Sequence, residues 1–140
     1  MIAEVVEYIA HRGYQIPMYG SKVQAGFPSP ADDFMEGKLD LNQHLIKRPA
    51  ATFLVRATGD SMLGASIHEG DILVVDRSVE PVDGKIVIAA VEGYLTVKRL
   101  QIKKGKMILL PENPKYPPIE INPETGIYIW GVVTNVIHAV

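Results

Sequence analysis

The sequence of 140 residues contains no cysteine. This absence excludes disulfide bonds, zinc–thiolate sites and thiol catalysis, and it fits a reducing compartment. The chain also lacks a basic excess, because 14 Lys and Arg residues stand against 16 Asp and Glu residues, for a formal net charge of -2 at pH 7. A chain without a positive field is a poor candidate for sequence-independent binding of nucleic acid.

Long apolar runs are missing as well. The longest runs, such as Ile86 to Val91, are far shorter than the ~18 residues that a membrane span requires. The N-terminus reads Met1-Ile2-Ala3-Glu4, without the basic start and continuous apolar stretch of a secretion signal. We therefore expect a cytoplasmic protein with no membrane partner.

The residues that are present describe an ordinary globular protein, with 47% hydrophobic and 21% charged residues. The character of the chain changes near Pro49. We expect an irregular N-terminal arm over residues 1–48 and a β-rich domain over residues 49–140, large enough to bury its own core.

Two short helices are expected in the arm, and a third segment has helical spacing but is too short to be stable as a helix alone. Apolar residues at 2, 5, 6 and 9 have helical spacing over Ile2 to His11. Ser29-Pro30 has the form of an N-cap followed by proline at the first helical position, for a helix that ends by Glu36. Asp40 is a further N-cap, for a helix over Leu41 to Ile46.

After Pro49 the pattern predicts one strand after another, rich in Val, Ile, Thr and aromatic residues. Glu92-Gly93 is a two-residue link between two of them, which is a strong hairpin signal. Short, closely spaced strands favour a mainly-β domain, a sandwich or partly closed barrel. The predicted strands are Thr52–Thr58, Ile72–Asp76, Lys85–Val91, Tyr94–Leu100, Lys106–Leu110 and Gly126–His138.

Ser61 stands in Gly59-Asp60-Ser61-Met62, directly after a predicted strand, so we expect it on a tight turn. If a helical turn starts at Asp60, free backbone N–H groups surround Ser61 and can stabilise an oxyanion. The alternative is that Asp60 and Ser61 only cap a turn, as such residues often do.

Lys98 lies on the second strand of the predicted hairpin, where alternation places it on one face with Thr96 and Leu100. A lysine acts as a general base only when it is neutral, and burial against apolar neighbours lowers its pKa from ~10.4. Ser61 or Thr96 would supply a hydroxyl partner. The alternative is a surface lysine whose stem covers the sheet.

The four histidines, at positions 11, 44, 68 and 138, are scattered and have no carboxylate close by in a recognisable triad or metal-ligand spacing. We therefore expect no histidine base, no metal site and no cofactor.

Several segments resemble the LexA/UmuD group of self-cleaving serine–lysine proteins, and the UmuD-like branch most closely. They follow in order from about residue 23, and together they are far more specific than Gly-Asp-Ser-Met, which signal peptidases share. The matching segments are residues 24–32 (QAGFPSPAD), 39–42 (LDLN), 59–62 (GDSM), 70–76 (GDILVVD), 86–91 (IVIAAV) and 96–98 (TVK).

The resemblance implies a serine peptidase with Ser61 as nucleophile and Lys98 as base, and with backbone amides of Asp60 and Ser61 as oxyanion donors. It places the self-cleavage site at Ala25–Gly26. This bond is Ala–Gly, as in LexA-type repressors, whereas the best-known UmuD has Cys–Gly.

The resemblance also implies partners. UmuD-like proteins form homodimers, respond to RecA filaments on single-stranded DNA in the SOS response, and after losing the arm join a UmuC-like DNA polymerase as translesion polymerase V. A LexA-type repressor needs a DNA-binding domain of ~60 or more residues before the cleavage site. Only 25 residues precede it here, so we expect no direct sequence-specific DNA binding.

Two rival interpretations remain from the sequence. A signal-peptidase-like processing enzyme would use the same pair of residues on other proteins, although it should carry a membrane anchor or an exposed apolar patch. A non-enzymatic β-rich adaptor would use Ser61 and Lys98 only as structural residues.

Overall fold

A computed structural model of the protein describes residues 3–6, 13–19 and 35–140. The chain divides into two compact units, one formed by Met1–Ile9 with Arg48–Val140 and the other by Ala10–Lys47. The predicted division into an arm (1–48) and a peptidase domain (49–140) as functional parts stays a prediction.

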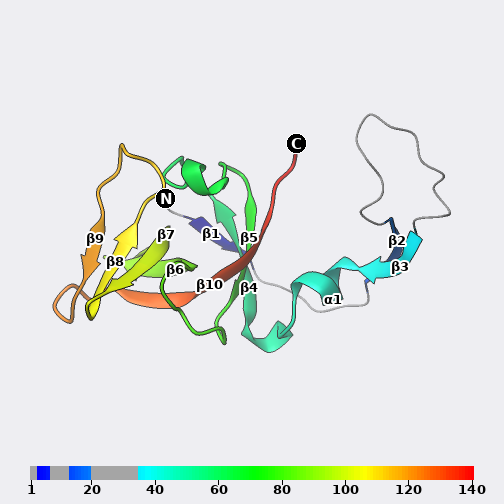
Figure 1. Ribbon diagram of the computed structural model, residues 1–140, viewed down its shortest axis with the longest axis horizontal. Helices are drawn as coiled ribbons and strands as arrows, with labels where there is room; N and C mark the ends of the chain where they lie inside the picture. The colour runs from blue at the N-terminus through cyan, green and yellow to red at the C-terminus, as the bar shows by residue number, and fades with distance from the viewer. Residues whose placement is uncertain (1–2, 7–12, 20–34) are drawn as a thin grey trace. The chain divides into compact units, whose positions relative to one another are not determined.

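The larger unit is built on an antiparallel sheet of eight strands among the described residues (Figure 1). Its order is β1-β4-β5-β10-β6-β7-β8-β9, and β1 and β9 are the two ends. Short 3-10 helices, η2 (Pro49–Ala51) and η3 (Leu63–Ala65), flank β4. The strands are β1 (Ala3–Val6), β4 (Thr52–Ala57), β5 (Ile72–Asp76), β6 (Ile86–Val91), β7 (Tyr94–Lys103), β8 (Lys106–Leu110), β9 (Ile119–Ile121) and β10 (Tyr128–Ile137).

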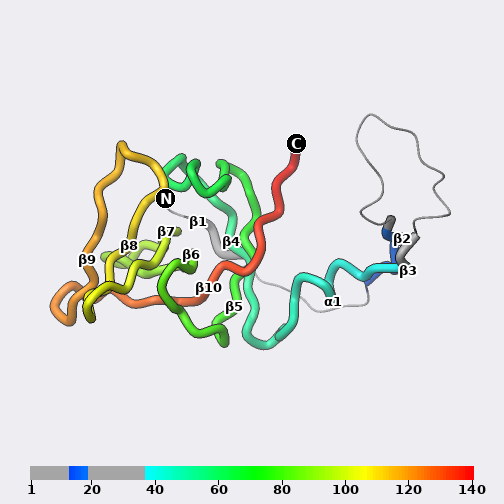
Figure 2. The backbone as a smooth tube through the Cα atoms, in the orientation of Figure 1, coloured from blue at the N-terminus to red at the C-terminus, as the bar shows by residue number. Residues whose placement is uncertain are grey.

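The last strand, β10, joins the two halves of this sheet, since it pairs with β6 near its start and with β5 near its end (Figure 2). The register shifts between Ile129 and Gly131, and again between Val133 and Asn135. Such bulges bend a strand and increase its twist. The bent β10 can therefore pair with both β6 and β5, which have different directions. At Gly131 a Cβ would lie 2.7 Å from Val75 Cγ1, so only glycine allows this close approach.

The β6–β7 hairpin forms as predicted, with Val91 opposite Tyr94. Glu92 and Gly93 have φ values of 49° and 81°, the left-handed conformations that a tight two-residue hairpin turn requires. The register then places Val87 opposite Lys98 and Ile88 opposite Val97.

Alternation along β6 divides the core into two clusters. Ile88 packs with Val97, Val55 and residues of β5, whereas Val87 and Ala89 pack in the second cluster. Neighbouring residues on a strand point to opposite faces, so both faces of this part of the sheet are covered. Each fully buried Val, Leu or Ile side chain stabilises the fold by about 1.5–3 kcal/mol.

The smaller unit contains a hairpin of β2 (Gln15–Tyr19) and β3 (Met35–Asp40), followed by the short helix α1 (Leu41–Leu45). The predicted cap is confirmed, because Asp40 Oδ1 accepts a hydrogen bond of 2.9 Å from the backbone N–H of Asn42. None of the helices in the described part of the chain is long and apolar enough to cross a membrane.

The mainly-β prediction is confirmed, but β1 and β9 are not paired with each other, so the sheet does not close into a barrel within the described residues. The helical spacing over 2–11 does not produce a helix where the chain is described. Ala3–Val6 forms β1, whose backbone pairs with the edge of β4. Pairing with an existing sheet edge overrides the weak preference of a short segment.

The helix expected from Ser29 to Glu36 is wrong at its end, because Met35 and Glu36 belong to β3. Its beginning lies outside the described residues. The strands β2, β3 and β9 were not predicted.

Candidate active site

Ser61 lies in the turn between β4 and η3, and only 1% of its surface is exposed. Two backbone hydrogen bonds tie this turn to the chain after β8. Glu112 N–H donates to Ser61 O at 2.8 Å, and Gly64 N–H donates to Glu112 O at 2.7 Å. A Cβ at Gly64 would lie 2.7 Å from Glu112 O, so the contact depends on glycine.

Asp60 is held by the same chain segment. Its carbonyl oxygen accepts a hydrogen bond of 2.9 Å from Asn113 Nδ2, and its Oδ1 accepts one of 2.6 Å from the hydroxyl of Tyr116. This hydrogen bond, together with the carboxylate charge, raises the pKa of Tyr116. Hydrogen bonds to both the side chain and the backbone of Asp60 therefore fix the position of this residue, which directly precedes Ser61.

The helical turn expected at Asp60 begins later, because η3 starts at Leu63. Among the described residues, none accepts a hydrogen bond from the backbone N–H of Asp60 or Ser61. Backbone donors that have no acceptor among the described residues, beside a serine hydroxyl, are the groups that an oxyanion would need.

Lys98 reaches this serine from β7 and is 4% exposed. Its Nζ lies 3.2 Å from Ser61 Oγ, 3.0 Å from Thr96 Oγ1 and 3.1 Å from Val97 O. Thr96 is two residues earlier on the same strand, so the predicted alternation places both side chains on one face. The alternative of a surface lysine is wrong for this position.

Burial lowers the pKa of Lys98 below its ordinary value. The ion pairs among the described residues join Asp76 to Arg48, Glu112 to Arg99, and Asp71 to His68 and His138; none of them includes Lys98. Desolvation disfavours the charged amine, and because no described carboxylate pairs with it, its neutral form becomes accessible at lower pH.

A cavity of about 290 Å³ opens beside this pair and is lined by Thr96 and Lys98. The first half of β7, up to Lys98, pairs with β6 only, since β8 pairs with Arg99 to Lys103. The second edge of this half-strand therefore has no strand partner within the described part of the chain. The other residues that line the cavity are Val91, Glu92, Tyr94, Tyr116, Pro117 and Ile119.

The structure thus brings Asp60, Ser61 and Lys98 together, and Ala25 and Gly26 lie outside the described residues. Sequence reasoning missed the segment from Glu112 to Tyr116, which holds the Ser61 turn. Asp60 and Tyr116 are separated by 56 residues, and no local sequence pattern predicts their contact. The described histidine–carboxylate cluster, His68 with Asp71 and His138, includes neither Ser61 nor Lys98.

The chain belongs to the Peptidase S24-like family, which it matches over residues 17–134. It is 52% identical to Protein SamA of Salmonella typhimurium over 122 residues, 87% of this chain and 84% of that protein. It is 41% identical to Protein MucA of Escherichia coli over 127 residues, 90% of this chain and 86% of that protein. LexA repressor 2 of Pseudomonas putida is 37% identical over 124 residues, 89% of this chain and 60% of the repressor.

These relatives confirm the resemblance stated from the sequence: the chain is UmuD-like, within the LexA/UmuD group of S24 serine peptidases and SOS mutagenesis proteins. Members of this family cleave themselves.

Proposed function

We propose that the protein is a self-cleaving serine peptidase in which Ser61 attacks the Ala25–Gly26 bond and Lys98 is the general base. The observation that carries this proposal is the distance of 3.2 Å between Lys98 Nζ and Ser61 Oγ, both almost fully buried. A base within hydrogen-bond reach of a hydroxyl is the arrangement that activates a serine.

In the proposed reaction, neutral Lys98 takes the proton of the Ser61 hydroxyl as the oxygen attacks the carbonyl carbon of Ala25. The backbone N–H groups of Asp60 and Ser61 stabilise the oxyanion that develops. The protonated lysine then gives its proton to the leaving amine of Gly26, and water hydrolyses the acyl-enzyme.

The substrate segment would bind along the unpaired edge of β7, beside the cavity that Thr96 and Lys98 line. An extended peptide can add to an open strand edge through main-chain hydrogen bonds. Small residues at 25 and 26 suit close approach of the backbone to Ser61. Because the arm is tethered, its effective concentration is high and a deep specificity pocket is unnecessary.

The rate of self-cleavage would be regulated by the fraction of time that the arm is docked at the active site. A rarely docked arm is cleaved slowly until a partner favours the docked state. The proposed partner is the RecA filament on single-stranded DNA. The fragment from Gly26 to Val140, as a homodimer, would then be the accessory subunit of a UmuC-like translesion DNA polymerase.

Incubation of the purified full chain at mildly alkaline pH, followed by mass spectrometry over time, tests this function. We expect fragments that end at Ala25 and begin at Gly26, formed faster with RecA filaments, and no cleavage in Ser61→Ala. Ser66→Ala, a nearby exposed serine, is the matched control and should cleave normally.

Two other outcomes would contradict the proposal, and each would favour a different function. A wild-type chain that stays intact even with RecA filaments would favour a non-enzymatic polymerase adaptor. Cleavage of added signal-bearing substrates while the Ala25–Gly26 bond survives would favour a processing enzyme.

A further inference from the structure

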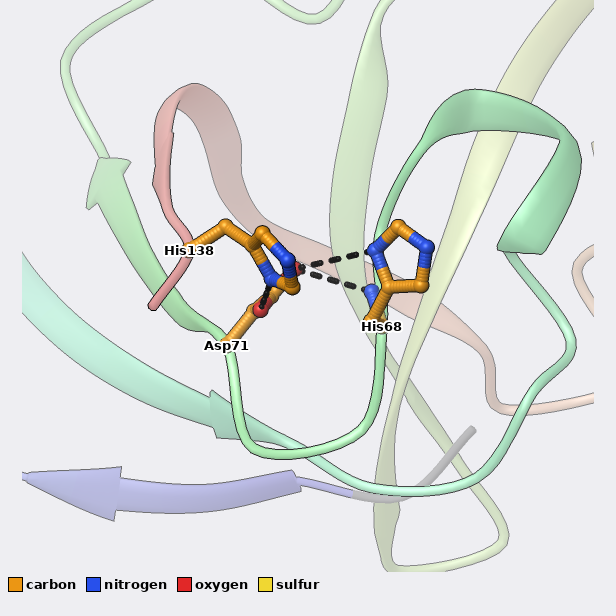
Figure 3. A group of neighbouring side chains, drawn as sticks. All are labelled: His68, Asp71 and His138. Atoms are coloured by element: carbon orange, nitrogen blue, oxygen red, sulfur yellow. Dashed lines mark hydrogen bonds and ion pairs between the residues drawn. The ribbon is translucent and has the colours of Figure 1, made fainter. Parts of the chain in front are cut away.

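A second group of ionisable side chains lies at the end of the sheet where β5 begins and β10 ends. His138 directly follows β10, and Asp71 directly precedes β5. Because Ile137 pairs with Ile72, the register sets His138 opposite Asp71. His68 completes the group from the loop before β5 (Figure 3).

Both imidazole rings turn Nδ1 toward the carboxylate between them (Figure 3). His138 Nδ1 lies 2.5 Å from Asp71 Oδ1, and His68 Nδ1 lies 3.8 Å from Asp71 Oδ2. The ring centroids are 4.7 Å apart, and one possible ligand atom from each residue lies within 4.8 Å of the other two.

We propose that His68, Asp71 and His138 bind a Zn²⁺ ion. Two imidazole nitrogens and one carboxylate oxygen are a ligand set that Zn²⁺ accepts, whereas Mg²⁺ and Ca²⁺ prefer oxygen ligands alone. Three protein ligands leave one position of a tetrahedral ion open to water or to a small exogenous ligand.

The carboxylate is already oriented for this role. Asp71 is 3% exposed, and its Oδ2 accepts a hydrogen bond of 2.8 Å from the backbone N–H of His68. Hydrogen bonds that orient a ligand in this way are typical of metal sites.

The side chains of the two histidines are accessible to an ion that enters from solvent. Their side chains are 47% exposed at His68 and 44% exposed at His138, so the group opens to solvent on the imidazole side. Metal–ligand bonds of about 2.0–2.2 Å place tetrahedral ligand atoms about 3.3 Å apart. His138 Nδ1 must move slightly away from Asp71, and His68 Nδ1 slightly closer, to reach this spacing.

Titration of ZnCl₂ into the full chain at pH 7.5, followed by calorimetry, tests the site. We expect one ion per chain, with affinity at least tenfold lower in His68→Ala and in His138→Ala. The matched control is His44→Ala, an exposed histidine of α1, which should bind as the wild type does. His68→Ala removes only the ring and keeps the backbone N–H that holds Asp71.

Imidazole ¹⁵N spectra supply a second readout, in which Zn²⁺ should shift the ring nitrogens of His68 and His138 and leave those of His44 unchanged. Ser61→Ala should bind zinc normally, so this proposal and the proposed peptidase fail independently. No measurable binding, or binding unchanged in both His68→Ala and His138→Ala, would overturn the zinc site.

Discussion

Lys98 and Asp71 are buried to nearly the same extent in the larger unit, with exposed fractions of 4% and 3%. The pKa of each is lowered, but with opposite consequences for charge. Lys98 has two hydroxyls and a carbonyl around its amine, so desolvation dominates and favours the neutral form. Asp71 has a backbone N–H and two imidazoles around its carboxylate, so its charged form is favoured despite burial.

Burial by itself therefore does not decide the charge state of an ionisable group. The groups within hydrogen-bond reach decide whether a buried side chain can act as a base or as an anionic ligand. Desolvation alone favours the neutral form of both residues.

The largest expected effect is that of Lys98→Met, which keeps the volume of the side chain and removes the amine. We expect self-cleavage to slow by at least about 1,000-fold, because a dyad loses nearly all its activity with either member. The free energy of unfolding at pH 7 should not fall, since a poorly solvated amine is replaced by an apolar group. Mass spectrometry and urea unfolding measure the two effects, and Lys106→Met on β8 is the exposed-lysine control.

The pH dependence of cleavage should show the next largest effect. Below the folded-state pKa of Lys98, the neutral fraction and hence the rate rise about tenfold per pH unit. The rate should level off below pH 10.5, because burial lowers this pKa from its ordinary value of 10.5. Initial rates measured from pH 6 to 10 test this, and a rate independent of pH would contradict the assignment of Lys98 as base.

The same shift has a consequence for stability. Between the folded-state pKa of Lys98 and 10.5, the unfolded chain binds more protons than the folded chain. The contribution of Lys98 to the free energy of unfolding should therefore rise with pH in this window. Lys98→Met should remove that rise.

Asp71→Asn should destabilise the fold by about 2 kcal/mol at pH 7, because a buried charge-assisted hydrogen-bond acceptor is lost. The folded-state pKa of Asp71 is lowered below 3.8, so its stabilising contribution is complete above 3.8 and disappears as the pH falls through the folded-state value. Urea unfolding at pH 7 and at acid pH should show the variant and the wild type converging in acid. The exposed neighbour Glu69→Gln serves as the control.

Thr96→Val should have the smallest effect, a decrease of about tenfold in the cleavage rate. The variant keeps the β-branched shape but removes a hydroxyl 3.0 Å from Lys98 Nζ, which costs about 1.4 kcal/mol of positioning. Thr134→Val is the matched control, since it removes a hydroxyl on β10 that donates a hydrogen bond of 3.3 Å to Val74 O on β5. Equal cleavage rates in the two variants would show that Thr96 does not position the lysine.

Local sequence determined much of the sheet and of the candidate active site. Alternation and turn residues predicted β5 and β8 with their observed bounds, and the Glu92-Gly93 turn of the β6–β7 hairpin. The face that Lys98 shares with Thr96 follows from the two-residue period of a strand, which needs no knowledge of the fold. The pairing of Ser61 with Lys98 was inferred from residue types and from the resemblance to a family.

Only the tertiary structure decided which distant segments meet. The tie between Asp60 and Tyr116, and the meeting of His138 with Asp71, depend on segments 56 and 67 residues apart. The strand β1 forms because β4 offers it an edge, against the helical spacing of its own residues. The physical reason is common to all three: hydrophobic periods and turns act over a few residues, whereas strand order and bulges place ionisable groups beside one another only when the whole sheet is assembled.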